Sequence, residues 1–169
     1  MTTDTTTAGR DKLWTMIKDI KFGMFTTRHP ENGHLHSRPM TTQNKELGAD
    51  DSLWYFMSRS SGPVEDLASE SKVNVAFADP GADTWVSVSG EAAVVNDRAK
   101  VEQLWSTMDE AWFEGGPQDP DLALVQVRIV HANYWDVKES KIVQLLERAK
   151  AALTGSQAKL GEHGEVRLG

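Results

Sequence analysis

The amino-acid sequence predicts a mainly β (α+β) domain, a small closed or split barrel with a few flanking helices. Six or so stretches have the apolar or alternating pattern of strands, and most of them follow one another without a helix between them. A parallel α/β sheet would need a helix after nearly every strand. The length of 169 residues fits a single hydrophobic core.

The first half of the chain is predicted to hold four strands and two helices. Residues 1–9 are polar and are expected to form a flexible arm. Apolar residues recur at helical spacing over 10–20, and a further helix is expected from Pro63, a residue type favoured at a first helical position. The predicted strands are 22–28, 34–43, 53–58 and 73–80, of which the first two form a hairpin around the sequence HPENG.

The second half alternates long strands with helices. Strand 84–97 places Val86 and Val88 on one face and Trp85 with two serines on the other, and Gly90 predicts a bend or bulge. Another strand is expected at 122–136. Two amphipathic helices are predicted, one at 98–113 and one at about 140–153. Trp105 and Trp112 lie on the core-facing stripe of the first. The polar, Gly-rich tail 154–169 is expected to be loose.

Composition restricts the function. A net charge of −7 argues against a general nucleic-acid binder, which needs a basic surface. The absence of cysteine rules out disulfides, thiolate metal sites and thiol nucleophiles. No apolar run approaches the roughly 20 residues of a membrane helix, and the polar N-terminus does not look like a signal peptide. A cytoplasmic protein without membrane partners is therefore expected.

The turn Ser58-Arg59-Ser60-Ser61-Gly62 precedes the helix at Pro63 and has two interpretations. Serine and glycine are favoured in any turn before a helix, so the segment can be a simple capped helix start with Ser60 or Ser61 as the cap. Alternatively, the free backbone N–H groups and the positive end of the helix dipole hold a phosphate, with Gly62 allowing close approach. The local sequence does not decide between them.

The segment HLHSRPMTTQ places His34, His36, Arg38 and Met40 on one strand face. An arginine on an inner barrel wall requires an anionic partner, whereas on an edge strand it can reach water. A metal site on the two histidines lacks an evident third ligand. No nucleophile elbow, dinucleotide fingerprint or P-loop is present. Trp85, on the polar face of its strand, suits a subunit interface or a flat ring ligand.

An ordered series of segments resembles the general stress protein 26-like family of pyridoxamine 5′-phosphate oxidase-like, FMN-binding split barrels. The segments are SRPM (37–40), LWYFMSRSSGPVEDL (53–67), VNVAFADP (73–80), VSVSGEA (86–92), NDRAKVEQLW (96–105), AWFEGGPQDPD (111–121) and ANYWD (132–136). The resemblance extends over nearly the whole chain from about residue 10. It implies a six-stranded split β-barrel over about 10–153 that forms a homodimer, with two FMN sites between the subunits.

The resemblance also implies a set of cofactor-binding residues. Arg38 would reach the phosphate or ribityl chain of the flavin, and Ser61, Gly62 and Pro63 would surround the phosphate. The remaining residues implied to line the flavin are Pro39, Met40, Phe56, Met57, Trp85 and Trp135, together with Trp112 and Phe113 from the partner subunit.

Two departures from the family pattern affect the expected function. Relatives usually carry lysine at the position of Pro63, and the oxidases proper carry arginine at Gly62, so FMN affinity is expected to be about tenfold or more lower. The arginines and histidine that grip pyridoxal phosphate after the final tryptophan are missing, so no vitamin B6 oxidase activity is expected. An FMN-dependent oxidoreductase and a non-catalytic flavin-sequestering protein both remain open, and FAD, a deazaflavin or haem are alternative ligands.

Overall fold

The computed structural model describes residues 2–4, 7–137, 148–152, 154–155 and 161–168. The strands are β1 (Thr2–Asp4), β2 (Gly23–Arg28), β3 (Leu35–Met40), β4 (Ser52–Ser58), β5 (Lys72–Asp79), β6 (Thr84–Val95), β7 (Leu122–Asp136) and β8 (Glu162–Arg167). The helices are α1 (Thr7–Ile17), α2 (Gly62–Leu67) and α3 (Arg98–Leu104), with short 3-10 turns at Asp109–Ala111 and Gly116–Gln118. The mainly β prediction is confirmed.

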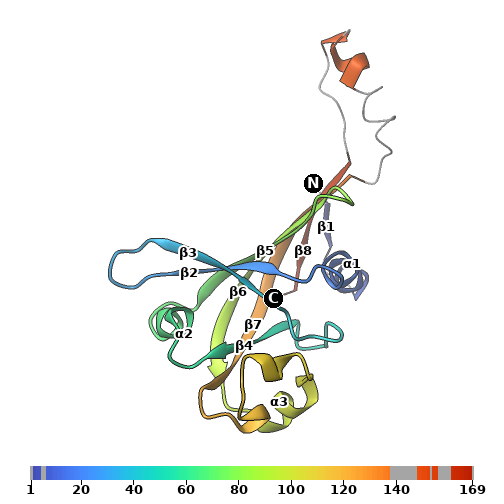
Figure 1. The fold of residues 1–169 in the computed structure, drawn as a ribbon. Coiled ribbons are helices and arrows are strands. Elements are labelled where there is room, and N and C mark those ends of the chain that lie inside the picture. The colour runs from blue at the N-terminus through green and yellow to red at the C-terminus, as the bar shows by residue number, and fades with distance from the viewer. Residues whose placement is uncertain (1, 5–6, 138–147, 153, 156–160, 169) are drawn as a thin grey trace.

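All eight strands form one curled sheet in the order β1-β8-β7-β6-β5-β2-β3, with β4 added beside β7 (Figure 1). The six strands β2 to β7 are antiparallel, and β2 and β3 form the predicted hairpin with Phe25 opposite Arg38. Strand β7 has 15 residues and carries two partners in turn along one edge. Its first half pairs with β4 and its second half with β8, while β6 pairs along the other edge.

The main core lies inside the curled sheet, because alternate residues of each strand point to one face. Val86 and Val88 are buried there as predicted, together with Phe25 and Tyr55, whose rings meet edge to face at 5.2 Å. Leu13 of α1 closes the main core as well. A second cluster lies where α3 covers β4 and the start of β7; it consists of Trp54, Phe56, Val101, Leu104, Phe113, Leu122 and Leu124.

The bulge predicted at Gly90 is confirmed. The register between β6 and β7 shifts between Ser89 and Gly90. A side chain could not fit at this point, since a Cβ on Gly90 would lie 2.5 Å from the carbonyl oxygen of Arg128. The bulge keeps Val86 and Val88 of the first half and Ala92 of the second half buried despite the irregularity.

The single helix predicted at 98–113 is wrong, because α3 ends at Leu104 and Trp105 is extended. The carboxylate of Asp109 accepts hydrogen bonds from the N–H and the hydroxyl of Ser106, at 2.9 and 2.7 Å. Such local side-chain bonds compete with the helical pattern and start a separate turn. Trp112 consequently lies outside the core stripe, with its side chain 83% exposed.

Two predictions for the ends of the chain are also wrong. The tail expected to be loose contains β8, which pairs with β7 from His131 to Asp136 and buries Val166 completely. The arm expected to be flexible contains β1, which runs parallel to β8. Their sequences are mostly polar and give little signal for a strand. Most of the helix predicted at 140–153 lies outside the described residues, and 148–152 are helical.

The start of β8 is joined to α1 by a polar cluster. Lys12 donates hydrogen bonds to the hydroxyl of Tyr134 at 2.9 Å and to the carboxylate of Glu162 at 2.6 Å. The Tyr134 hydroxyl donates to the same carboxylate. Burial lowers the pKa of Lys12, but the hydrogen bonds and charges of Glu162 and Tyr134 together outweigh it, so the pKa is raised. The cluster therefore fixes the C-terminal strand to the barrel.

Candidate functional site

The start of α2 is an open corner of the molecule. Ser61 occupies the N-cap position in an extended conformation, with Pro63 in the first turn as predicted. Its hydroxyl does not cap the helix, because it donates instead to the carbonyl of Ser58 at 2.6 Å. A Cβ added at Gly62 would meet no atom within 4 Å. The corner therefore leaves room for a ligand, and the predicted side-chain cap is wrong.

Asp121 holds the turn before α2. Its carboxylate accepts hydrogen bonds from the hydroxyl of Ser58 at 2.6 Å and from the N–H and hydroxyl of Ser60, both at 3.3 Å. Arg59 is fixed beside it, donating to the backbone carbonyl of Leu122 at 3.0 Å. The hydrogen bonds from Ser58 and Ser60 lower the pKa of Asp121, so the carboxylate is ionised at neutral pH. The serines at 58 and 60 thus have an internal anion as their partner.

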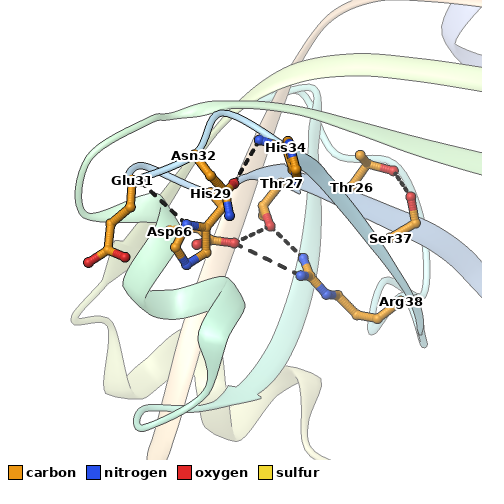
Figure 2. Close-up of polar contacts among 9 residues, drawn as sticks. All are labelled: Thr26, Thr27, His29, Glu31, Asn32, His34, Ser37, Arg38 and Asp66. Atoms are coloured by element: carbon orange, nitrogen blue, oxygen red, sulfur yellow. Dashed lines mark hydrogen bonds and ion pairs between the residues drawn. The ribbon is translucent and has the colours of Figure 1, made fainter.

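Arg38 lies on the inner side of β3 and points toward α2 (Figure 2). Its Nη1 donates a 2.6 Å hydrogen bond to the hydroxyl of Thr27 on the neighbouring strand. The Thr27 hydroxyl in turn donates to the carboxylate of Asp66 on α2, also at 2.6 Å. The second terminal nitrogen of Arg38 lies 3.9 Å from the same carboxylate. The structure contains elements of both alternatives for Arg38: β3 is an edge strand of the sheet, and the anion near the guanidinium is Asp66.

The charge of Arg38 is only partly compensated by this arrangement. Burial lowers its pKa and the nearby Asp66 carboxylate raises it, with burial the larger of the two effects. A guanidinium remains protonated under these conditions. A partly desolvated cation whose ion pair is 3.9 Å long attracts a further anion more strongly than a fully solvated arginine would.

Pro39, Trp85 and Trp135 lie on the outer face of the sheet, opposite to Arg38. Trp85 and Trp135 are directly paired neighbours on β6 and β7, with side chains 39% and 42% exposed. The Trp135 ring also stacks on His163 of β8, with the ring centroids 4.9 Å apart and the planes 7° from parallel. Three aromatic residues therefore lie on three neighbouring strands of this face, and His163 was not among the predicted residues.

Three other predicted site residues are packing residues within this chain. Phe56 and Phe113 belong to the second hydrophobic cluster, where the Phe56 ring lies 5.7 Å from that of Trp105. Met57 is buried in the main core. Met40 is partly buried against the main core. Trp112 is the most exposed large apolar residue among those described.

The predicted residues therefore fall into separate groups on a single chain. Arg38 reaches α2, the helix that starts at Gly62. Trp85 and Trp135 face the other side of the sheet, and Trp112 is exposed outside the hydrophobic core. In the part of the chain that the structure describes, no three His, Asp or Glu residues are placed to hold a metal ion. None of the described helices is long and apolar enough to cross a membrane.

Comparison with solved structures defines the class of the fold. A structure from Jannaschia sp. CCS1, described as a general stress protein 26, matches with a TM-score of 0.73 at 23% identity, covering 94% of this chain and 97% of that one. The general stress FMN/FAD binding protein of Xanthomonas citri matches with a TM-score of 0.67 at 33% identity, covering 80% and 93%. The fold is thus a split barrel of the pyridoxamine phosphate oxidase type, as the sequence resemblance implied.

Sequence comparison identifies the family. Residues 9–159 match the profile of the family described as pyridoxamine 5′-phosphate oxidase like. The protein bli-3 of Neurospora crassa is 32% identical over 162 residues, which cover 91% of this chain and 77% of that protein. The chain belongs to the pyridoxamine 5′-phosphate oxidase-like family, and its resemblance to general stress protein 26 is confirmed.

Sequence reasoning missed Thr27, Asp66 and Asp121. Thr27 and Asp66 are 39 residues apart and are brought together only when α2 packs beside β2. Both are almost completely buried, at 0% and 3% exposure. The one signal available was Asp66 itself, an acidic residue on the buried side of a short helix, which requires a partner.

Proposed function

We propose that the protein binds FMN and acts as a flavin-dependent oxidoreductase with a stress-related role, distinct from a pyridoxamine phosphate oxidase. The observation that carries this proposal is Arg38, an arginine on the inner side of β3 whose guanidinium is fixed by hydrogen bonding and directed toward the helix that begins at Gly62. The Xanthomonas citri relative, at 33% identity, is described as an FMN/FAD binding protein.

The residues at this corner fit a phosphate group. Gly62 faces open space at the start of α2, and Arg38 supplies a partly buried cation 3.9 Å from Asp66, near the other end of the same short helix. The negative charge of Asp66 repels a second anion, but its carboxylate already accepts a hydrogen bond from the Thr27 hydroxyl. FMN ends in a phosphate monoester, whose oxygens can accept hydrogen bonds from both terminal nitrogens of an arginine. Each bridging phosphate of FAD carries less negative charge than this monoester. FMN is therefore the proposed ligand.

In this proposal the flavin supplies hydride or one-electron transfer, and the protein binds and orients it. Arg38 holds the phosphate, and Ser61, Gly62 and Pro63 surround it. Trp85, Trp112 and Trp135 are exposed but lie away from Arg38 within one chain, so they could cover a flat ring system and keep water from it only in an assembly that brings them to the flavin. The missing lysine and arginine at positions 63 and 62 leave Arg38 as the principal cation for the phosphate.

We propose further that the site is completed by a second copy of the chain, as the family resemblance implies. Trp112 is 83% exposed and, with Trp85 and Trp135, provides apolar surface suited to an interface. Sedimentation equilibrium is expected to give twice the chain mass of 18.7 kDa. A monomer that still binds FMN tightly would contradict a site formed between subunits.

The substitution Arg38→Ala is expected to weaken FMN binding about 10- to 150-fold, because a hydrogen bond to a charged group contributes about 1.5–3 kcal/mol. Flavin fluorescence quenching during titration measures the dissociation constant. Arg128→Ala is the matched control, since Arg128 is an exposed arginine paired with Glu91 on the sheet. Equal FMN affinity of the Arg38→Ala variant and the wild type would refute the proposed position of the phosphate.

Turnover is tested separately from binding. Reduction of the bound flavin by NADH or NADPH, followed by reoxidation with an acceptor, would establish the oxidoreductase. Stable FMN binding with no reduction by either donor would favour the alternative of a flavin-sequestering protein.

A further inference from the structure

We infer that Thr27 is a positioning residue that fixes the guanidinium of Arg38 for the phosphate of the ligand, with Asp66 orienting the Thr27 hydroxyl. The inference rests on the proposed function, because it assigns a role at the same corner. Figure 2 shows the Thr27 hydroxyl between the Asp66 carboxylate and the Arg38 guanidinium, at the point where β2, β3 and α2 meet.

The hydrogen-bond inventory of these groups sets the direction of each bond. An arginine has only donors and an ionised carboxylate has only acceptors, whereas a hydroxyl has one donor and two acceptor lone pairs. The single proton of Thr27 goes to Asp66, so its lone pairs are left for Nη1 of Arg38. The Thr27 side chain is completely buried, which excludes water as a substitute partner.

The distances show that Thr27, and not the ion pair, holds the arginine. Both bonds through the Thr27 hydroxyl measure 2.6 Å, whereas Nη2 of Arg38 and the Asp66 oxygen are 3.9 Å apart. A separation of 3.9 Å is beyond hydrogen-bond length. Nη1 thus has one N–H committed to Thr27, and the remaining N–H groups of the guanidinium are kept in a defined orientation for an incoming anion.

Arg38 needs this support more than an arginine in an ordinary phosphate site would. Gly62 and Pro63 contribute no side-chain cation, and the guanidinium of Arg59 is bound to the Leu122 carbonyl. A flexible arginine loses side-chain entropy when it binds, and a fixed one has lost it beforehand. Thr27 therefore compensates in part for the missing basic residues by preorganising the one that remains.

The test compares dissociation constants for FMN and for riboflavin, which lacks the phosphate, in the full-length protein. For Thr27→Val we expect FMN binding about tenfold weaker and riboflavin binding unchanged, because only the phosphate contact depends on Arg38. Thr27→Ser retains the hydroxyl and is expected to behave as the wild type. The riboflavin constant reports whether the fold is intact, since a merely structural defect would weaken both ligands.

Thr26→Val is the matched control on the same strand. The Thr26 hydroxyl bonds the Ser37 hydroxyl at 2.7 Å on the exposed side of the hairpin, away from Arg38 (Figure 2). Removing it is expected to leave the preference for FMN over riboflavin unchanged. An equal loss of preference in Thr26→Val and Thr27→Val would show a general effect of the hairpin and would overturn the inference.

Asp66→Asn separates the hydroxyl from the ion pair and serves if Thr27→Val does not fold. An amide oxygen can still accept the Thr27 proton, while the negative charge near the phosphate is removed. We expect the FMN preference of Asp66→Asn to equal or exceed that of the wild type. A loss of about tenfold would mean that the charge of Asp66 holds Arg38 directly and would overturn the role of Thr27.

The results also separate this inference from the proposed function. If the wild type does not prefer FMN to riboflavin, or if Arg38→Ala retains the preference, the proposed phosphate site is wrong and the inference fails with it. If Arg38→Ala abolishes the preference and Thr27→Val keeps it, the phosphate site stands and the inference alone is wrong.

Discussion

Phe56→Ala is expected to destabilise the protein by about 3–5 kcal/mol, the range typical of removing a buried aromatic ring. The Phe56 side chain is 6% exposed and packs in the second hydrophobic cluster, with its ring 5.7 Å from that of Trp105. The cluster joins β4 and β7 to α3, so a cavity there weakens three elements together. The free energy of unfolding, measured by urea titration with tryptophan fluorescence, tests the expectation.

Leu35→Ala is the matched control for that measurement. Leu35 is also a large apolar side chain, but it is 71% exposed on the edge strand β3. Its removal is expected to change the free energy of unfolding by no more than about 0.5 kcal/mol. A loss below about 1 kcal/mol in Phe56→Ala would contradict its packing role and would favour the cofactor contact that the family resemblance implied.

Gly90→Ala is expected to destabilise the protein by about 1–3 kcal/mol, the typical range for overpacking a tight interior. The added Cβ would lie 2.5 Å from the Arg128 carbonyl oxygen and 2.8 Å from a methyl group of Val127. The first of these is backbone of β7, which can move only by disturbing the longest strand of the sheet. The midpoint of thermal unfolding by circular dichroism measures the effect.

Gly62→Ala provides the comparison for Gly90→Ala. A Cβ at Gly62 would have no neighbour within 4 Å, so the apoprotein is expected to keep its wild-type unfolding midpoint. Similar unfolding midpoints for the two variants would show that the bulge can relax, and would contradict the close approach of β6 and β7 at Gly90.

The strands could be predicted because their side-chain pattern reflects burial directly. The alternation around Trp85, Val86 and Val88 gave both the strand and its faces, and Gly90 marked the bulge. The end of α3 could not be predicted from spacing, because Trp112 continues the helical period while the Ser106–Asp109 hydrogen bonds stop the helix. Strand β8 was missed because Val166 is its one buried apolar side chain and the rest of its sequence is polar or glycine.

The candidate site was predicted less completely than the fold. Strand periodicity placed Arg38 on one face of its strand and left open whether it pairs with an anion or reaches water. In the structure β3 is an edge strand, and the anion near Arg38 is Asp66. The partner could not be found from sequence because it comes from a helix 28 positions further along, through the intermediate Thr27 hydroxyl. The serines before α2 suggested an external anion, whereas Asp121 binds Ser58 and Ser60.

The position of the phosphate is tested most directly by a crystal structure of the protein grown or soaked with FMN. Electron density for the phosphate is expected within about 3 Å of the Arg38 guanidinium, beside Gly62. FMN bound with its phosphate elsewhere, and the corner at Gly62 filled by solvent or by the protein's own side chains, would contradict it.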